Sequence, residues 1–238
     1  MDRLVARPDG VNTPASRQPA SLAKTFDNGL RVLIHLAGTP AGHTTAEIAS
    51  GLGLDRTVTY RLLATAAGRG LVVTDSAGRH TVGPGALQLA AAFRRDLREA
   101  ADPILAALAE ALSATTFLTV ADGDDGVVVS VSEPRATAMH VAYRAGSRHR
   151  LDQGAPGLAI LAALPARPQE RSDVAIARAR GYAVTQGELQ PGASGIACAL
   201  PTGDIAASVG VVTLQPLNVE KVVPPLRSAA QSIAHALG

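Results

Sequence analysis

Apolar residues recur with helical spacing along residues 44–54 and again along residues 55–68. In the first segment, Thr45 is placed to cap the start of a helix, and Gly51 or Gly53 can adopt the positive φ that ends one. In the second segment, polar residues crowd the face opposite the apolar one. Two short helices joined by a glycine-bearing turn predict a helix-turn-helix.

A β-hairpin is predicted directly after the second helix. Residues 71–74 are strand-like, residues 75–78 contain the Asp, Ser and Gly typical of a turn, and residues 79–82 return as a second strand. A helix-turn-helix that is followed at once by a hairpin predicts a winged helix-turn-helix.

The second helix carries residue types that read the grooves of DNA. Val58 and Leu62 are expected to face the core, whereas arginines suited to phosphates or guanine edges share the opposite face with hydroxyls and a phenol. Arg79 and His80 are expected on the wing, beside the DNA backbone. The predicted DNA-binding residues are Thr45, Arg56, Thr57, Thr59, Tyr60, Arg61, Arg79 and His80. The alternative interpretation is a small helical subdomain that makes protein contacts.

The segments before this motif complete an N-terminal domain, which we place at residues 21–83. Residues 1–20 contain Pro and Gly with few large apolar groups, and predict a disordered arm. Ser21 can cap a helix over residues 22–37, which is expected to form the floor under the helix-turn-helix. Its apolar positions are Phe26, Leu30, Leu33, Ile34 and Ala37.

A helical linker is predicted between this domain and the remainder of the chain. Residues 84–101 favour a helix with an apolar stripe, which indicates either dimerisation or packing on its own domain. Asp102 and Pro103 have the pattern of a cap and a first-turn proline. They predict that a new helix starts here and continues through Leu112.

From residue 102 to residue 238, short extended segments alternate with helices, which predicts an α+β sensor-like domain. Strands are expected at residues 116–121, 127–131, 137–143, 195–200 and 206–214. Helices are expected at residues 155–164, 172–180 and 218–237. Pro224 and Pro225 are expected to interrupt the last of these helices.

Composition narrows the class of protein. The chain has 238 residues, 47% of them hydrophobic, but only 3% are aromatic and none is Trp, so the core must consist of Ala, Leu, Val and Ile. It contains no apolar run of about 18 residues and no signal-peptide pattern, so no membrane span is expected. The single Cys rules out an internal disulfide and is typical of the cytoplasm.

Charge is distributed unevenly along the chain. Residues 1–83 contain nine Lys and Arg against six Asp and Glu, a net charge of +3. Residues 84–238 contain thirteen against fourteen, a net charge of −1. The positive excess therefore coincides with the predicted DNA-binding domain.

Catalytic and metal-binding patterns are absent from the sequence. The six histidines show no metal-ligand spacing, and one Cys cannot complete a zinc finger. Residues 192–196 miss the Gly-x-Ser-x-Gly spacing of a serine hydrolase, and no glycine-rich loop is suited to phosphates. We therefore expect no catalytic residue, no metal site, no cofactor and no enzymatic activity.

The order of these parts resembles the IclR family of bacterial transcriptional regulators, from Ser21 to the C-terminus. Residues 54–65 are similar to the family's recognition helix, residues 70–72 and 78–83 to its wing, and residues 97–105 to the junction with its effector domain. The C-terminal signature of the family is matched by residues 181–184, 188–192 and 196–197.

The resemblance implies a winged helix domain and a GAF-like effector-binding domain. It also implies a homodimer or tetramer on a palindromic operator in double-stranded DNA. It further implies that a small molecule, often an organic acid or an aromatic compound, alters DNA binding. We expect a repressor rather than an activator. The effector-binding residues carried over are Ala155, Pro156, Thr185, Ser194, Gly195 and Thr213. A ligand carboxylate near residues 154–157 would meet the N–H groups of a helix N-terminus, although Pro156 lacks one of these donors.

The chain departs from the family pattern in the same region. Asp152 and Leu158 stand where the family often has His and Lys, and Gly195 stands at the position of its signature cysteine. Three hypotheses remain open at this point. The protein is a ligand-responsive regulator, a regulator that has lost its ligand, or a small-molecule-binding protein or enzyme whose N-terminal domain makes only protein contacts.

Overall fold

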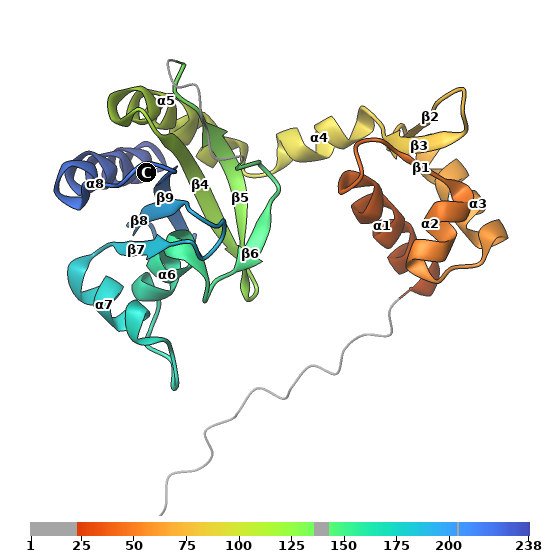
Figure 1. Ribbon diagram of the computed structural model, residues 1–238. Helices are drawn as coiled ribbons and strands as arrows, with labels where there is room; N and C mark the ends of the chain where they lie inside the picture. Colours follow the sequence, from red (N-terminus) through yellow and green to blue (C-terminus); the bar gives the residue numbers. More distant parts are fainter. Residues whose placement is uncertain (1–22, 136–142, 204) are drawn as a thin grey trace, which may run out of the picture. The chain divides into compact units, whose positions relative to one another are not determined.

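The computed structural model describes residues 23–135, 143–203 and 205–238, and the chain divides after Phe93 into two units that are described separately (Figure 1). The predicted arm at residues 1–20 and the cap at Ser21 lie outside the described residues. So does nearly all of the strand predicted at residues 137–143.

The N-terminal unit is a winged helix-turn-helix, as the sequence predicts. Its helices are α1 (Lys24–Ala37), α2 (Thr45–Leu52), α3 (Arg56–Ala67) and α4 (Gly85–Ala92). Its antiparallel sheet has the order β1 (His43–Thr44), β3 (Arg79–Val82) and β2 (Val72–Thr74). The buried residues that join these elements are Val32, Leu36, Ile48, Leu63 and Val72.

Capping side chains define the turn between α2 and α3. Thr44, rather than Thr45, caps α2, and its side chain and backbone N–H exchange hydrogen bonds with Glu47 in a capping box. Gly53 ends α2 with a φ of 64°. Asp55 then caps α3 by accepting hydrogen bonds from the N–H groups of Thr57 and Val58.

The buried faces of α1 and α3 differ from the sequence prediction. In α1, Val32 and Leu36 are buried, whereas Phe26, Leu30 and Ile34 are exposed. In α3, Leu63 is buried and Val58 is exposed. The predicted core faces were correct at Leu33 and Leu62, which are partly buried against this core, and wrong at Phe26, Leu30, Ile34 and Val58. The errors arise because neighbouring apolar positions in a short helix allow two adjacent faces to be chosen as the core face.

The helix break falls earlier than predicted. Helix α4 ends before Phe93, and α5 (Arg95–Leu112) continues through Pro103 without interruption. Leu97, Ala101 and Leu105 are fully buried along one face of α5. This packing outweighs the tendency of Pro103 to start a new helix. Residues 95–101 therefore belong to the C-terminal core rather than to a separate linker.

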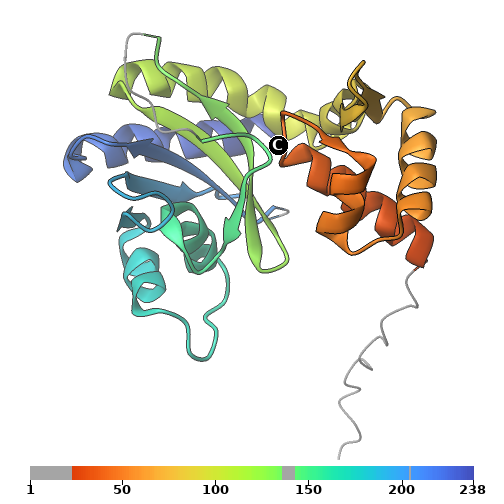
Figure 2. The same cartoon turned by 45° about the vertical axis from the view of Figure 1, so that its right-hand side comes forward.

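The C-terminal unit is built on a six-stranded antiparallel sheet in the order β6-β5-β4-β9-β8-β7. The strands are β4 (Thr115–Asp122), β5 (Asp125–Ser132), β6 (Arg148–Arg150), β7 (Ala183–Gln186), β8 (Ser194–Ala199) and β9 (Ala207–Thr213). The short strands β6 and β7 were not predicted. Helices α5 and α8 (Val219–Ala236) cover one face, and α6 (Gly154–Ala163) and α7 (Ser172–Arg180) lie on the other (Figure 2).

Helix α8 contains Pro224 and Pro225 without a break, so the predicted interruption is wrong. Val222, Val223 and Leu226 are buried on both sides of the proline pair. Their packing holds the helix in place although two backbone donors are missing. The overall α+β class of the unit is as predicted.

The two central strands supply both faces of the sheet. In β9, Val209 and Val211 enter the core with α5 and α8. Gly210 is paired with Phe117 of β4 on the face that α6 covers. A Cβ atom at Gly210 would overlap the Phe117 ring, so the ring can lie across β9 only because this position has no side chain.

We therefore expect Gly210→Ala to destabilise the C-terminal unit by about 1–3 kcal/mol, because the Phe117 ring must move out of its packed position. Thermal denaturation followed by circular dichroism measures the effect. Gly203→Ala is the matched control, since a Cβ there meets no atom within 4 Å. Equal melting temperatures for the two variants would show that the ring has room to adjust.

Candidate functional site

The N-terminal part of α3 presents polar side chains to solvent. Arg56, Thr57 and Arg61 are exposed, and the Tyr60 side chain is 63% exposed. Together with Thr45 from the start of α2, three of these residues line a shallow hollow in the surface. Neither Arg56 nor Arg61 forms an ion pair with any residue that the structure describes. The structure thus brings together five of the eight residues predicted to bind DNA.

Thr59 does not belong to this surface, and its prediction as a DNA-binding residue is corrected. Its side chain is 0% exposed, and its hydroxyl donates to the carbonyl oxygen of Asp55 over 2.9 Å. The same error placed Val58 in the core: the prediction chose the wrong face of α3 as the buried one.

His80 is also buried, which corrects its predicted place beside the DNA backbone. One ring nitrogen lies 2.9 Å from the Thr45 hydroxyl, and the other lies 2.9 Å from the Thr74 hydroxyl. The imidazole therefore bridges the start of α2 and strand β2 of the wing. Burial lowers its pKa, and the charge of Asp75 opposes this effect only in part.

Arg79 is half-exposed and engaged within its own domain. Its guanidinium donates to the carbonyl oxygen of Gly42 over 2.8 Å and lies 3.5 Å from the Glu47 carboxylate. Hydrogen bonds from Thr44, and more weakly the charge of Arg79, lower the pKa of Glu47. These contacts fix the wing against α2, so Arg79 has less freedom to reach a phosphate than the sequence suggested.

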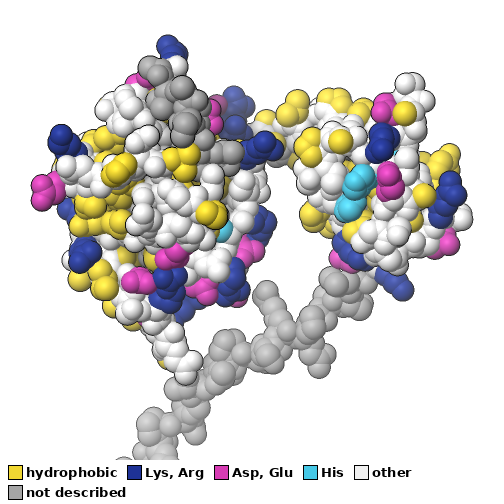
Figure 3. All heavy atoms as spheres, in the orientation of Figure 1, with side chains coloured by type: hydrophobic (Ala, Val, Ile, Leu, Met, Phe, Trp, Pro, Cys, Tyr) yellow, Lys and Arg dark blue, Asp and Glu magenta, His cyan; other side chains and the backbone are white. Residues whose placement is uncertain are grey.

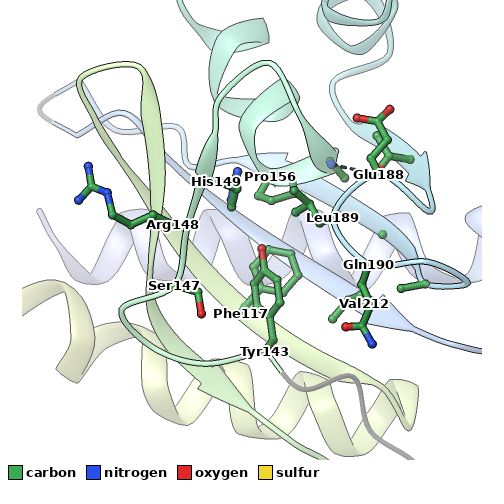
Figure 4. A pocket seen from close by; sticks show the side chains of 14 residues that line it. Phe117, Tyr143, Ser147, Arg148, His149, Pro156, Glu188, Leu189, Gln190 and Val212 are labelled. Carbon is green, nitrogen blue, oxygen red and sulfur yellow. Dashed lines mark hydrogen bonds between the residues drawn. The ribbon is translucent and has the colours of Figure 1, made fainter. Parts of the chain in front are cut away.

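A cavity of about 230 Å³ lies in the C-terminal unit, on the face of the sheet that α6 covers (Figure 4). Four predicted effector-binding residues line it: Ala155, Pro156, Thr185 and Gly195. Ser194 and Thr213 do not line it. They are paired with each other across β8 and β9, one position away from the paired Gly195 and Val212, and strand alternation directs them to the other face.

Sequence analysis missed most of the cavity wall. The missed residues that define its shape and polarity are Phe117, Tyr143, His149, Glu188, Leu189 and Val212. Glu188 and Leu189 lie in the C-terminal signature, so a signal for them was present. Tyr143 is the last residue of the strand predicted at residues 137–143, and His149 lies in the unpredicted strand β6. No local pattern marks either of them as a cavity residue.

The N-terminus of α6 is already occupied by an internal carboxylate. The Gly154 N–H donates to Glu188 over 2.8 Å, and the Ala155 N–H donates to the Thr185 hydroxyl over 2.9 Å. Pro156 has no N–H to offer. The expected place for a ligand carboxylate is therefore filled by Glu188, a side chain of the chain itself.

Arg171 completes this arrangement from the N-terminal cap position of α7. Its guanidinium contacts both oxygens of Glu188 over 3.0 Å each and bonds Asp173 over 2.6 Å. The hydrogen bonds from Arg171 lower the pKa of Glu188, and the Gly154 N–H contributes in the same direction. Glu188 is thus held as a carboxylate at the cavity wall.

Two polar atoms at the cavity have no partner among the described residues. They are the hydroxyl of Tyr143 and Nε2 of His149, and both are inaccessible to solvent. Buried polar atoms are normally hydrogen-bonded, so this pair indicates where a ligand would bind.

The described residues contain no group of three or more His, Cys, Asp or Glu that could hold a metal ion. None of the described helices is long and apolar enough to cross a membrane.

Comparison with known proteins assigns both units to one family. A sequence profile of the IclR helix-turn-helix domain matches residues 25–76. A profile of the C-terminal domain of the bacterial transcriptional regulator IclR matches residues 89–173. The chain belongs to the IclR family. It is therefore a DNA-binding transcriptional regulator of the IclR type.

Individual relatives agree with this assignment. This chain is 29% identical to the HTH-type transcriptional regulator BhcR of Paracoccus denitrificans, and the alignment covers 88% of this chain and 84% of BhcR. The crystal structure of an IclR transcriptional regulator from Alicyclobacillus acidocaldarius superimposes on this chain with a TM-score of 0.80 at 23% identity. The superposition covers 91% of this chain and 100% of the Alicyclobacillus chain.

A third relative was solved with a small molecule. It is an IclR homolog from Microbacterium hydrocarbonoxydans complexed with 4-hydroxybenzoate, with a TM-score of 0.77 at 20% identity. The comparison covers 90% of this chain and 98% of the homolog. At these identities, the two solved structures establish the IclR fold of the chain.

The burial of His80 predicts a pH-dependent stability of the IclR helix-turn-helix domain. The pKa of His80 is lowered from its ordinary value of 6.5, so the unfolded chain takes up a proton at higher pH than the folded one. The stabilisation from neutral His80 is complete above about pH 6.5 and declines as the pH falls through the window below it.

We expect the urea midpoint, followed by the amide NMR signals of the β2–β3 hairpin, to fall on acidification. It should fall less in His80→Gln, whereas His235→Gln, at an exposed position of α8, should leave the fall unchanged. An identical decline in His80→Gln and the wild type would assign the effect to other groups.

Proposed function

We propose that this IclR-family regulator binds a palindromic operator as a homodimer and represses transcription there, and that a small organic effector in the C-terminal cavity alters this binding. The observation that carries the proposal is the exposed surface of Arg56, Thr57, Tyr60 and Arg61 at the start of α3. It contains two guanidinium groups without an ion pair among the described residues.

Physical chemistry supports DNA as the partner of this surface. An arginine can donate two hydrogen bonds to the edge of a guanine, and hydroxyls can bond bases or phosphates. Each phosphate that the protein neutralises releases about 0.9 counterion, so operator affinity should fall steeply with salt concentration. The caps Thr44 and Asp55 fix the α2 and α3 termini that present these groups.

Arg61→Ala is expected to weaken operator binding by about 1–3 kcal/mol if the side chain reads a base. A gel-shift titration on the intergenic DNA upstream of the protein's own gene, against random duplex, measures the change. Arg135→Ala is the control, because this arginine is exposed on the other unit. Unchanged affinity in Arg61→Ala would remove this residue from the interface. Equal binding of both DNAs by the wild type would favour protein contacts for the domain.

Helix α4 supports the homodimer. Its side chains include Leu87 and Leu89, which are 71% and 66% exposed, and none of its residues is buried. Hydrophobic side chains gather on the surface over this helix (Figure 3). An apolar helix that its own domain leaves uncovered is suited to a second copy of the same chain.

Leu87→Glu is expected to shift the dimer towards monomer, because a carboxylate would be buried without a partner at the interface. Analytical ultracentrifugation over a concentration series gives the dissociation constant, which should rise by about tenfold or more. Gln88→Glu introduces the same charge at the next exposed position and serves as the control. The dimer interface lies elsewhere if both variants dissociate at the wild-type concentration.

The cavity supports a small-molecule effector. It lies between the sheet and α6, and it combines an apolar floor with unpartnered polar atoms. Pockets of this kind are the usual binding sites of small ligands. The homolog complexed with 4-hydroxybenzoate supports such an effector for this chain as well.

A further inference from the structure

We propose that the cavity selects an uncharged small ligand that carries a hydroxyl group, and that it disfavours carboxylates. This inference rests on the proposed effector function of the cavity and names the chemical class of the effector. Three sets of observations carry it: the charges around the cavity, the unpartnered atoms in its wall, and its size.

The donors that would attract a carboxylate are already used. The first N–H of α6 binds Glu188, the second binds Thr185, and Pro156 provides none. A ligand carboxylate at this helix end would therefore meet the negative charge of Glu188 instead of free N–H groups. The ligand carboxylate and the Glu188 carboxylate would repel each other, and this repulsion is strongest where water is excluded.

The arginines near the cavity are shared between carboxylates. Arg171 contacts Glu188 and Asp173, so this cluster has one more negative charge than positive charge. Arg148 lies 2.7 Å from Asp122 and 3.4 Å from Asp125, which gives a second cluster with the same excess. In Figure 4, the Arg148 guanidinium points away from Phe117 and Tyr143. Among the residues that line the cavity, no unpaired cation is available for an anionic ligand.

His149 offers a hydrogen-bond acceptor. Its Nδ1 lies 3.0 Å from the carbonyl oxygen of Arg150, which can only accept, so Nδ1 must donate. In the neutral ring, Nε2 then carries a lone pair and no proton. Nε2 is buried and has no partner among the described residues. A ligand hydroxyl is the neutral group that would donate to it.

Tyr143 offers a complementary hydroxyl. Its ring packs against Phe117 with the centroids 4.7 Å apart, and its oxygen is buried without a partner among the described residues. Figure 4 shows this oxygen directed into the cavity. Burial raises the pKa of the phenol, so the hydroxyl keeps its proton and can donate to an oxygen of the ligand.

The size and walls of the cavity favour a single ring. Phe117, Pro156, Leu189 and Val212 provide apolar surface, and the volume is about 230 Å³. An apolar cavity of about 150 Å³ holds benzene in another protein. One substituted ring therefore has room here, with its hydroxyl near His149 and a second neutral oxygen near Tyr143.

Three probes of nearly equal shape test the inference on the full chain at neutral pH. They are 4-hydroxybenzamide, which is neutral, 4-hydroxybenzoate, which is an anion, and 4-methoxybenzamide, which lacks the donating hydroxyl. Isothermal titration calorimetry and the shift in melting temperature report binding to the folded protein. We expect the hydroxyamide to bind about tenfold or more tightly than the benzoate, which corresponds to about 1.4 kcal/mol. The methoxyamide should bind more weakly than the hydroxyamide.

Variants identify the groups responsible. Tyr143→Phe should weaken binding of 4-hydroxybenzamide by about fivefold, the loss typical of one hydrogen bond. Glu188→Gln keeps an oxygen for the Gly154 N–H but removes the charge, and leaves Arg171 with one carboxylate partner fewer. Glu188→Gln should therefore reduce or reverse the difference in affinity between 4-hydroxybenzamide and 4-hydroxybenzoate. Glu220→Gln, in an exposed position of α8, removes the same charge and should leave the preference unchanged. Circular dichroism confirms that each variant is folded.

Each outcome is decisive. Binding of 4-hydroxybenzoate as tight as or tighter than that of the hydroxyamide would overturn the inference. Failure of both to bind the wild type would overturn it as well. Operator binding, measured without any ligand, tests the proposed function separately. If the protein binds DNA specifically but prefers 4-hydroxybenzoate, or binds neither probe, only the proposed ligand class is rejected. If the protein does not bind DNA specifically, the regulator function is rejected whatever its ligand preference.

Discussion

The contact between the Phe117 ring and Gly210 joins the two central strands of the C-terminal sheet, and both faces of that sheet depend on it. Because side chains alternate along a strand, placing Phe117 on one face directs Leu118 of β4 and Val209 of β9 into the core with α5 and α8. The same contact makes the aromatic ring the floor of the cavity. The Phe117 ring thus contributes both to the packing of the two central strands and to the cavity wall, on the face of the sheet that α6 covers.

Glu188 determines the electrostatic character of the cavity. In an isolated helix, the N-terminus is a site for anions. Here the Glu188 carboxylate occupies the N-terminus of α6, and the Arg171 guanidinium holds it in place by hydrogen bonds to both of its oxygens. With this helix end filled, the buried polar atoms that the described residues leave to a ligand in the cavity wall are the hydroxyl of Tyr143 and Nε2 of His149.

The sequence predicted architecture better than it predicted side-chain surroundings. The winged helix-turn-helix and the α+β class followed from periodicity and turn residues, which are local signals. The buried face of α3 did not follow from these signals, because Val58 and Thr59 are neighbours in the sequence. Only the packing of Leu63 against Val72 decides which of the two is buried. Tyr143 and His149 could not be found, since tertiary packing alone brings them to the cavity. Pro103, Pro224 and Pro225 show core packing prevailing over local preference.

The bridge from Thr45 through His80 to Thr74 has a mechanical consequence. It links the first turn of α2 to a wing strand through one buried ring, while Arg79 ties the neighbouring wing residue to Gly42. Hinge motion of the hairpin would have to break all of these bonds at once. The first turn of α2 and the wing are consequently expected to move together, so a change in the position of one carries the other with it.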